Sequence, residues 1–582
     1  MRHRAVGLAL GAFGLSLIVL VAMAAVGPFG SNIPSDAASV GPSGSNAPSA
    51  APSIDPFAST DPSAALDPPR FVEEAAAAGI DHRYDGDFSY FVGGGVAVFD
   101  CNDDGRQEVY LAGGVEPAAL YRNESQLAGV LRFSLIHDPA TDMTQVTGAY
   151  PLDIDGNGVT DLALLRVGEN ILLRGLGDCR FEPANVAWGL DGGDEWTTAF
   201  SATWEGSAEW PTLAFGNYRN EASDDIDRLC FDNELVRPNA THDGFASGLP
   251  LNPSWCALSM LFSDWDRSGR RDLRVSNDRH YYSDFGEGEE QLWRVEPGEP
   301  PRTWTHAEGW QTVKVWGMGI ASQDLTGDGY PEIFLTSQGD NKLETLTDGP
   351  AQPRYENIAP ERGADAPRPF AGDVGMRSTA WHAEFQDVNN DGLMDLFVAK
   401  GNVEAQPDYA ALDPSNLLLG QADGTFVESA QEAGIVSFAR ARGASLADFN
   451  LDGMLDLIVV NRRTSVKLWR NVGWGDATRP LPMGNWLALE LVAPAPNRDA
   501  IGAWIEIKIG DRTTWREVTV GGGHAGGQLG WVHFGLGAAE GADVAVRWPD
   551  GEQGPWMAVQ ANRFYTVERG ALDALPWTPA GD

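Results

Sequence analysis

The sequence predicts an all-β chain, namely a seven-bladed β-propeller followed by a small C-terminal β-sandwich-like domain. Three observations predict this fold. A nine-residue acidic pattern recurs at regular intervals, and a short apolar run typical of a buried strand follows each copy. Residues 485–570 alternate apolar and polar positions. The 68 glycines and 36 prolines among the 582 residues indicate many turns.

The recurring pattern has an oxygen-bearing side chain at positions one, three and five, glycine at position six and a carboxylate at position nine. Calcium takes six to eight oxygen ligands at about 2.3–2.6 Å, and magnesium, which demands stricter octahedral geometry, fits less well. Glycine lets the backbone double back so that these oxygens converge. The pattern predicts about six calcium ions, one in each complete copy. The candidate ligands are Asp100, Asn102, Asp104 and Glu108; Asp153, Asp155, Asn157 and Asp161; Asp264, Asp266, Ser268 and Asp272; Asp324, Thr326, Asp328 and Glu332; Asp387, Asn389, Asp391 and Asp395; Asp448, Asn450, Asp452 and Asp456.

The spacing of the copies predicts the number of blades. The first two copies begin 53 residues apart, and the last four begin 60, 63 and 61 residues apart. The interval of 111 residues between the second and third is about two periods, so a degenerate copy is expected there. Residues 200–211 align with the pattern, which makes seven repeats. We expect no metal in this copy, because its ligand positions carry Thr203, Glu205, Ser207 and Pro211.

Each repeat is expected to form four strands, which is the composition of a propeller blade. One strand precedes the acidic loop and a second follows it. Residues 468–471 are an example of the third strand, and residues 426–435 are an example of the fourth. A segment like this fourth strand lies at residues 71–80, and none follows Asn471. We therefore expect residues 71–80 to supply the outer strand of the last blade and to close a ring over residues 70–480.

The N-terminus predicts export. Arg2 and Arg4 precede an apolar run that continues to about Val26, so residues 1–29 are expected to be a signal peptide or a retained signal anchor. Residues 30–69 are rich in Ser, Pro and Ala and are expected to be a disordered linker. The protein is therefore expected outside the cell or at its surface, with this segment as its only membrane contact.

Charge and cysteine content restrict the partners and the redox state. The net charge of −41 argues against nucleic acid or an anionic membrane surface as partner. Four cysteines in an exported protein suggest disulfides, and four cysteines allow three pairings. We favour Cys230 with Cys256, which would close one long loop, and then Cys101 with Cys179.

The acidic loops resemble the FG-GAP (VCBS-type) repeats of integrin α-chain heads. Residues 70–570 more closely resemble the cartilage acidic protein family through its ASPIC/UnbV C-terminal domain. Gly526 stands where that family usually has Ser. The resemblance implies an extracellular calcium-binding or adhesion-like protein and no established reaction. The segments that carry it are residues 497–503, 516–518, 521–528, 533–537, 547–551 and 562–564.

The C-terminal domain is expected over residues 485–570, with residues 571–582 as a tail. Its glycine-rich loop, residues 521–528, contains His524 and permits two interpretations. It is either a binding loop or a tight turn whose glycines serve packing alone, and we favour the turn.

In FG-GAP propellers the calcium loops lie on one face, and the loops after the second strand of each blade lie on the other. The resemblance places three long loops on that second face, at residues 217–256, 277–291 and 401–416. Aromatic and arginine side chains are typical binding anchors, although tryptophans can instead wedge neighbouring blades together. The candidate residues for an extracellular protein or glycan ligand are Tyr281, Tyr282, Trp316, Trp381, His382, Tyr409, Arg440 and Arg442.

Two classes of function compete. The first is an extracellular binding or adhesion-type module, a monomer in which calcium stabilises the blades. The alternative is a calcium-dependent hydrolase or lyase acting on polysaccharide or lipid. The sequence has no H-E-x-x-H motif, no nucleophile elbow in a suitable context and no Cys/His pair. Carboxylates committed to metal are poor general acids or bases. We therefore expect a binding protein and no enzyme, with a purely structural cell-surface role as the remaining reading.

Overall fold

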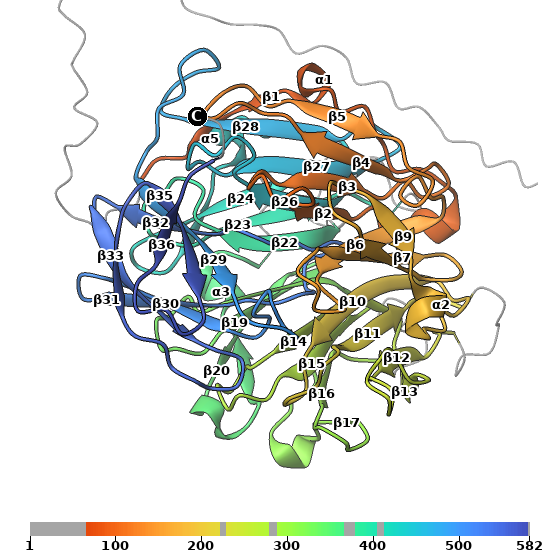
Figure 1. The fold of residues 1–582 in the computed structure, drawn as a ribbon. Helices are drawn as coiled ribbons and strands as arrows, with labels where there is room; N and C mark the ends of the chain where they lie inside the picture. Colours follow the sequence, from red (N-terminus) through yellow and green to blue (C-terminus); the bar gives the residue numbers. More distant parts are fainter. Residues whose placement is uncertain (1–65, 221–228, 279–287, 366–378, 404–412, 580–582) are drawn as a thin grey trace, which may run out of the picture. The chain divides into compact units, whose positions relative to one another are not determined.

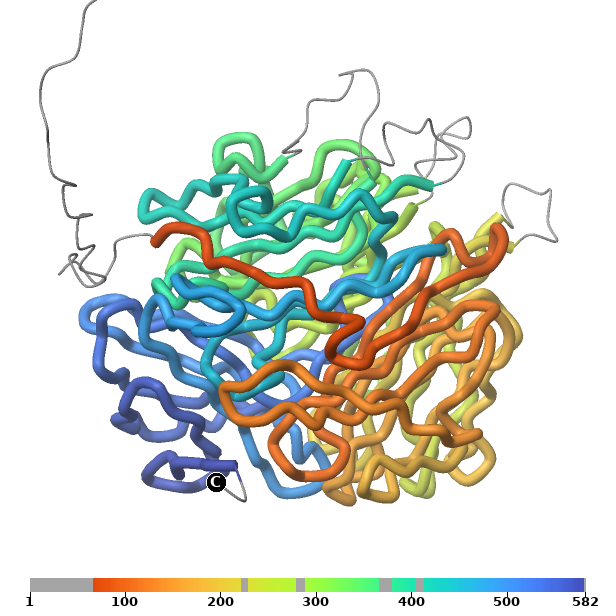
Figure 2. Tube along the Cα trace, turned by 90° about the horizontal axis from the view of Figure 1, so that it is seen from above, coloured from red at the N-terminus to blue at the C-terminus, as the bar shows by residue number. Residues whose placement is uncertain are grey.

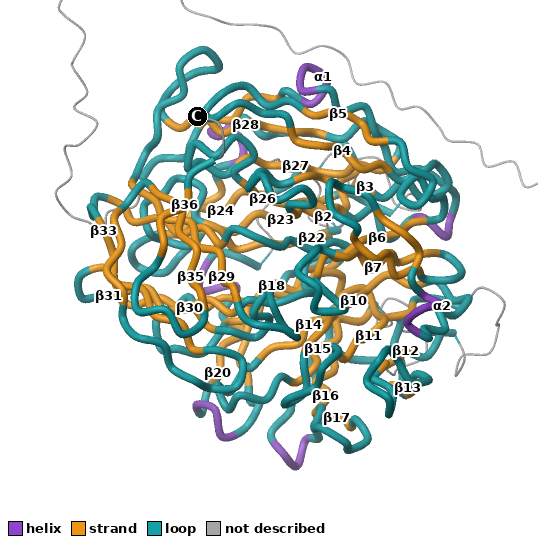
Figure 3. Tube along the Cα trace, in the orientation of Figure 1, coloured by secondary structure: helices purple, strands orange, loops and turns teal. Residues whose placement is uncertain are grey.

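The computed structural model describes residues 66–220, 229–278, 288–365, 379–403 and 413–579. The predicted signal segment, most of the predicted linker, Tyr281, Tyr282 and Tyr409 lie outside these ranges. No helix within them is long and apolar enough to cross a membrane. Strands and loops dominate, and the helices are single turns (Figure 3). These helices are α1 (Ala75–Ala78), α2 (Asn185–Trp188), α3 (Ala359–Arg362), α5 (Ala430–Ala433), η1 (Phe88–Tyr90), η4 (His306–Glu308) and η5 (Gly349–Ala351).

The strands of the repeat region form seven four-stranded antiparallel sheets within the described ranges (Figure 1). Six of them are made of four consecutive strands. They are β2 (Val96–Phe99), β3 (Glu108–Leu111), β4 (Ala119–Asn123) and β5 (Phe133–Ile136); β6 (Val146–Leu152), β7 (Asp161–Arg166), β8 (Ile171–Gly175) and β9 (Phe181–Pro183); β10 (Thr197–Thr203), β11 (Thr212–Asn217), β12 (Asn233–Val236) and β13 (Leu249–Leu251); β14 (Ala257–Ser263), β15 (Asp272–Asn277), β16 (Gln291–Arg294) and β17 (Arg302–Thr303); β18 (Gly317–Gln323), β19 (Glu332–Ser337), β20 (Lys342–Leu346) and β21 (Tyr355–Asn357); β22 (Ala380–Gln386), β23 (Asp395–Lys400), β24 (Asn416–Gly420) and β25 (Phe426–Glu428).

The seventh sheet joins the two ends of the repeat region. It contains β26 (Arg440–Ala447), β27 (Asp456–Arg462) and β28 (Lys467–Gly473), and its outer strand is β1 (Arg70–Glu73), which pairs antiparallel with β28 (Figure 2). The N-terminal segment thus supplies the outer strand of the last sheet, as expected. The strand itself is shorter than the expected range of residues 71–80. The alanines after it form α1, which ends at Gly79 in the left-handed conformation.

The seven sheets are arranged in a closed cycle. The first strands β2, β6, β10, β14, β18, β22 and β26 contact one another in this order, and β26 returns to β2. Neighbouring sheets share one apolar core: the cluster around Phe99 includes Tyr110 of β3, Phe181 of β9 and Ile458 of β27. Each sheet thus covers the apolar face of the next, as in β-propellers.

The C-terminal residues form two further four-stranded sheets. The first has the order β32 (Val532–Gly537), β29 (Asn485–Val492), β35 (Arg563–Glu568), β36 (Leu575–Trp577), and its β29–β35 pair is parallel. The second has the order β31 (Arg512–Glu517), β30 (Trp504–Ile509), β33 (Gly541–Arg547), β34 (Met557–Gln560). The expected tail after residue 570 therefore contributes a strand, because Trp577 packs on Trp531 and Phe564.

Both favoured disulfides are formed. Cys101 is bonded to Cys179, which joins the first acidic loop to the β8–β9 hairpin of the next sheet. Cys230 is bonded to Cys256 and ties the segment after β11 to the start of β14.

Candidate metal centres

The six acidic loops share one backbone conformation. The glycine at position six has φ between 80° and 88° in every loop, which is the left-handed region. The residue at position four is also left-handed, even where it is Asp103 or Leu451. The N–H of the position-six glycine donates to the first aspartate of its own loop, as from Gly158 to Asp153 Oδ2 at 2.8 Å. The chain therefore reverses direction around the first carboxylate.

The position-nine carboxylate opens the second strand of each sheet and turns back toward the loop. In five loops it accepts a hydrogen bond from the N–H at position two, as Asp161 Oδ2 does from Ile154 at 2.8 Å. Its other oxygen accepts from the next strand, as Asp161 Oδ1 does from Gly175 at 2.7 Å. A backbone network therefore fixes the two ends of the loop opposite each other.

Carboxylate oxygens converge in the second loop. Asp153, Asp155 and Asp161 each place one oxygen so that all three lie within 4.8 Å of one another. Burial, followed by repulsion from neighbouring carboxylates, raises the pKa of Asp153 to about 7. Burial likewise raises the pKa of Asp161 to about 8. Arg174 Nε lies 2.8 Å from Asp155 Oδ2, so one arginine already approaches the outer carboxylate.

Carboxylates of other acidic loops also have raised pKa values. Burial raises the pKa of Glu108 to about 8 and that of Glu332 to about 7. In the last two loops it holds the pKa of Asp395 and Asp456 well above the usual range, and neighbouring carboxylates add to the effect. Several buried carboxylates around one point are stable together only when protonated or neutralised by a cation.

The last loop supplies an independent test of whether the donor set fits a cation. Asn450 is fully buried at position three, and its Oδ1 has no hydrogen-bond partner. Its Nδ2 donates to Asp452 Oδ2 at 3.0 Å and to the carbonyl of Gly129 at 2.8 Å, so the amide nitrogen is satisfied and the oxygen is left over. A buried acceptor beside three carboxylates fits a hard cation.

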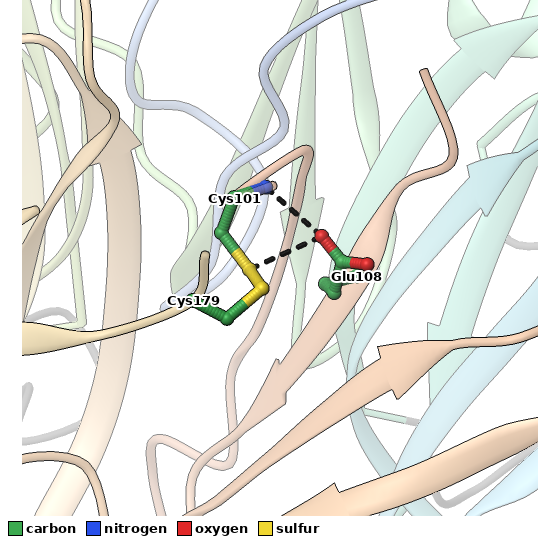
Figure 4. Close-up of side chains that lie close together, drawn as sticks. All are labelled: Cys101, Glu108 and Cys179. Atoms are coloured by element: carbon green, nitrogen blue, oxygen red, sulfur yellow. Dashed lines mark hydrogen bonds between the residues drawn. A yellow bond between two sulfur atoms is a disulfide. The ribbon is translucent and has the colours of Figure 1, made fainter. Parts of the chain in front are cut away.

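The first loop is linked to a disulfide. Figure 4 shows Cys101 bonded to Cys179, with Glu108 beside the bond. Glu108 Oε2 accepts from the N–H of Cys101 at 2.9 Å and lies 3.1 Å from its Sγ. The sulfur carries no proton in the disulfide, so the second approach is a close contact. Neither sulfur is a thiolate, which leaves oxygen atoms as the ligands of this loop.

The degenerate third copy holds an arginine. Arg237 Nε donates to Glu205 Oε1 at 2.6 Å and its Nη2 donates to Glu205 Oε2 at 2.9 Å. Thr212 Oγ1 also donates to Glu205 Oε1, at 2.6 Å. A guanidinium thus neutralises the carboxylate of the loop in which we expect no metal.

The C-terminal sheets pack against the acidic loops. Asp499 Oδ2 accepts from the N–H of Asp153 at 2.9 Å, and Glu517 Oε1 accepts from the N–H of Asp264 at 2.9 Å. Further contacts reach, among other places, the first, second and fifth complete loops and the strand that leads into the fourth. They join Trp531 Nε1 to Gly105 O (2.9 Å), Arg498 Nε to Gly156 O (2.7 Å), Gln323 Nε2 to Trp515 O (2.8 Å), His533 Nε2 to Asn390 Oδ1 (2.7 Å) and Arg512 to Gly392.

A cavity of about 420 Å³ remains between these sheets and the loops. Glu490 and Asp499 line it from the C-terminal side, and Asp100 and Asp103 line it from the first loop. Burial raises the pKa of Glu490 to about 7, and the neighbouring Asp100 and Asp499 add to the effect. The sequence pattern did not reveal Glu490, Asp499 or Glu517 as neighbours of the loops, because they lie in another domain. The only available signal was that Asp499 and Glu517 fall inside the C-terminal family motifs.

The glycine-rich loop at residues 521–528 occupies the centre of the ring, and we call residues 520–529 the axial loop. It hydrogen-bonds to the first strand of every sheet. These bonds join Val98 N to Gly527 O (3.0 Å), Ala149 N to Ala525 O (3.2 Å), Ser201 Oγ to Val520 O (2.5 Å), Gly522 N to Met260 O (2.7 Å), Gly523 N to Ile320 O (2.6 Å), His524 N to His382 Nδ1 (3.2 Å) and Gln528 Nε2 to Leu446 O (3.3 Å).

Close backbone approach explains the glycines of the axial loop. A Cβ on Gly526 would lie 2.1 Å from the carbonyl oxygen of Val96, so no side chain fits where the family usually has Ser. A Cβ on Gly95, the residue before β2, would lie 1.6 Å from the carbonyl oxygen of Ala525. His524 is fully buried, and its Nε2 accepts from the N–H of Gly93 at 3.1 Å. The favoured reading of this loop, a turn whose glycines serve packing, matches this geometry.

Three candidate ligand-face residues have internal roles, which corrects our expectation for them. Trp381 and Arg442 are fully buried, with the guanidinium carbon 4.2 Å from the centre of an indole ring. Trp381 Nε1 donates to Gly401 O at 2.7 Å, and Arg442 Nε donates to Phe91 O at 2.7 Å. His382 is 6% exposed and accepts from His524. Trp316 and Arg440 are half-buried.

The comparisons with known proteins agree with the two resemblances. Residues 493–573 match the family model "ASPIC and UnbV", and residues 387–459 match the model "FG-GAP-like repeat". Cartilage acidic protein 1 of Mus musculus is 29% identical over 150 residues. This match covers 25% of the chain and 21% of the mouse protein, so the chain spans about a fifth of that relative.

Two solved structures match part of the chain. A lectin of Agrocybe aegerita, in a study of recognition of non-reducing terminal N-acetylglucosamine, is 15% identical with a TM-score of 0.36. It covers 63% of this chain and 88% of its own. BBS1N in complex with ARL6DN is 10% identical with a TM-score of 0.38, and covers 67% of this chain and 96% of its own.

Proposed function

We propose that the chain is an exported, calcium-binding, seven-bladed β-propeller with a docked C-terminal β domain, acting as an extracellular binding or adhesion-type module. The observation that carries the proposal is the convergence of Asp153, Asp155 and Asp161 oxygens within 4.8 Å. The family matches over residues 387–459 and 493–573 fit an extracellular β-propeller module.

The donor chemistry favours calcium. Candidate ligands in the acidic loops are oxygen atoms of Asp, Asn, Glu, Thr and Ser, and hard cations prefer such donors to nitrogen or sulfur. Bound calcium would supply positive charge among carboxylates that are otherwise buried together. The chain's own contribution is the rigid reversal at position six and the position-nine carboxylate, which opens the second strand.

The role we propose for calcium is to hold the sheets and the C-terminal domain together. Asp499 hydrogen-bonds to the backbone of the second loop, and Arg512 hydrogen-bonds to that of the fifth complete loop. A loop fixed by a cation presents these backbone atoms in one geometry. The C-terminal sheets therefore act as a cap whose fit depends on loaded loops.

The partner surface we propose is the side of the ring away from the C-terminal sheets. The acidic-loop side is already covered by contacts such as Trp531 with Gly105. On the other side Phe88, 38% exposed, packs on Trp196 and lies under the guanidinium of Arg219. Aromatic and arginine groups of this kind suit an extracellular protein or a glycan.

Calcium titration of the full-length protein tests the proposal. Isothermal titration should detect calcium binding, and the Asp161→Asn variant should lose one site. Asp511→Asn, at an exposed hairpin turn, is the control and should bind as the parent does. The proposal fails if the parent protein binds no calcium at millimolar concentrations. Incubation with polysaccharides and phospholipids tests the alternative that the chain is a hydrolase or lyase, because an enzyme would convert one of them to product.

A further inference from the structure

We infer that the loop at residues 264–272 is closed by Arg270 instead of a cation, so that the chain has five calcium-binding loops where the sequence pattern predicts six. The inference rests on the proposed function, since it concerns one member of the same set of loops. Its evidence is the hydrogen bonding of Asp272, which differs from that of the other five position-nine carboxylates.

Asp272 has no acceptor position left for an ion. Arg270 Nε donates to its Oδ1 at 2.9 Å, and Arg270 Nη2 donates to its Oδ2 at 3.3 Å. The indole N–H groups of Trp265 and Trp304 donate to the same Oδ2 at 3.0 and 2.8 Å. The N–H of Val295 also donates to Oδ1, at 3.4 Å. A carboxylate offers about four lone-pair positions, two on each oxygen, so these donors occupy both oxygens. The Asp272 side chain is 0% exposed, so water does not compete for it.

Arg270 also reaches the second acidic group of the loop. Its Nη2 lies 3.5 Å from Asp266 Oδ2, at position three. A calcium ion in this loop would bridge the same two carboxylates, at positions three and nine. The guanidinium and the ion are therefore alternatives, and the guanidinium is part of the chain.

The first loop provides an internal comparison, because it also has an arginine at position seven. There Arg106 Nε donates to Ser125 O at 2.9 Å, and its Nη1 lies 4.0 Å from Asp104 Oδ2 at position five, so it does not hold the position-nine carboxylate. Glu108 accepts only from uncharged donors within the described residues, among them the N–H groups of Cys101 and Asn123. An arginine at position seven is therefore not sufficient to close a loop in place of a cation.

The tryptophans distinguish the two loops. In the 264–272 loop Trp265 stands at position two, and Trp304 follows β17 in the outer part of the same sheet. The two rings contact each other edge to face with centroids 5.8 Å apart. The guanidinium of Arg270 lies 5.8 Å from the Trp304 ring, which favours the inward position of its side chain.

In the preceding sheet an arginine also takes the place of a cation. Arg237 holds Glu205 through two hydrogen bonds in the degenerate third copy. Two adjacent sheets therefore carry an arginine that holds a loop carboxylate through two hydrogen bonds. In the second loop, by contrast, Arg174 approaches Asp155 and leaves the position-nine Asp161 to backbone donors. The cation-binding loops are then the two before these sheets and the three after them.

Metal counting on the full-length protein tests the inference. After dialysis against millimolar calcium and a brief wash, elemental analysis should find five calcium ions per chain. Asp272→Asn should leave the count at five, whereas Asp395→Asn, the matched substitution in the 387–395 loop, should lower it to four. Arg270→Leu introduces the residue type found at position seven of that loop and should raise the count to six.

The outcomes separate this inference from the proposed function. Six ions in the parent protein, with a loss of one in Asp272→Asn, would overturn the inference and leave the proposed function standing. No calcium in the parent protein or in any variant would overturn both. Should Asp272→Asn fail to fold by circular dichroism, the parent count and the gain in Arg270→Leu decide the matter.

Discussion

The imidazole of His524 lies against the indole of Trp381, with ring centroids 5.0 Å apart, inside the ring of seven sheets. The two residues come from different parts of the chain, since Trp381 belongs to β22 and His524 to the axial loop of the C-terminal domain. Their contact, with the hydrogen bonds of the axial loop to every first strand, makes the C-terminal domain part of the ring's core.

Acid should weaken this packing. Burial, with added repulsion from Arg442 and His382, lowers the pKa of His524 to about 3, from an ordinary value of 6.5. The unfolded chain binds this proton more readily, so stability is complete above pH 6.5 and falls as the pH drops toward 3. At pH 5 the loss from this residue is about 2 kcal/mol. Denaturant unfolding of His524→Gln, compared with the parent, should show a flatter dependence between pH 7 and pH 5.

His533 has the same sign of effect, because burial lowers its pKa to about 3 as well. The His524→Gln variant, which retains His533, therefore keeps some acid sensitivity. An unchanged pH dependence in His524→Gln would show that the His524 imidazole is not buried as described.

The close approach of the axial loop should make Gly526 intolerant of any side chain. A methyl group there would lie 2.1 Å from Val96 O, a backbone atom that cannot move without disturbing β2. Gly526→Ala should lower the free energy of unfolding by about 3 kcal/mol, at the upper end for overpacking. Gly554→Ala, whose new atom would lie 3.1 Å from its nearest neighbour, serves as control. Equal stabilities of the two variants by denaturant unfolding would contradict the placement of the axial loop.

Loss of the guanidinium at the third sheet should be costly. Arg237→Leu leaves Glu205 buried without its partner, and breaking a buried pair costs about 3–5 kcal/mol. The exposed pair of Arg302 with Glu308 offers the matched control, and Arg302→Leu should cost less than about 1 kcal/mol. Urea unfolding midpoints measure both, and similar values for the two variants would show that Glu205 does not depend on Arg237.

Reduction of the Cys101–Cys179 disulfide should weaken the first acidic loop and the whole fold together. The bond closes 78 residues of chain, and the chain-entropy model gives about 4 kcal/mol for a loop of this length. Cys101→Ser with Cys179→Ser should lower the melting temperature and the calcium affinity of one site. The pair Cys230→Ser with Cys256→Ser should lower the melting temperature alone, because it lies outside the acidic loops. Equal effects on calcium binding would contradict this distinction.

Local sequence was sufficient to predict the acidic loops, the repeat period and the placement of the first strand at the outer edge of the last sheet. Asp, Asn and Gly at fixed offsets impose the same turn wherever they occur, which is why all six loops share their backbone. The left-handed residue at position four was not predicted, because Leu451 and Arg267 rarely adopt that conformation. Neighbouring hydrogen bonds around the first aspartate hold them there.

Long-range contacts account for most of what the sequence did not predict. Nothing in the local pattern of Glu517 shows that it meets the backbone of Asp264. Trp381 and Arg442 have the residue types of binding anchors, yet packing of the axial loop buries them. Asp272 fits the metal pattern in sequence, and only the structure shows that Arg270, Trp265 and Trp304 already engage its oxygens.

Thermal unfolding of the full-length protein in EDTA and in millimolar calcium tests the central claim, that cations hold the acidic loops, most directly. A site at ten-fold saturation adds roughly 1.4 kcal/mol, so several sites together should raise the melting temperature by many degrees. Magnesium at the same concentration should give a smaller rise. Identical melting temperatures in EDTA and in calcium would mean that the loops are ordinary Asp/Gly turns, and would contradict the account.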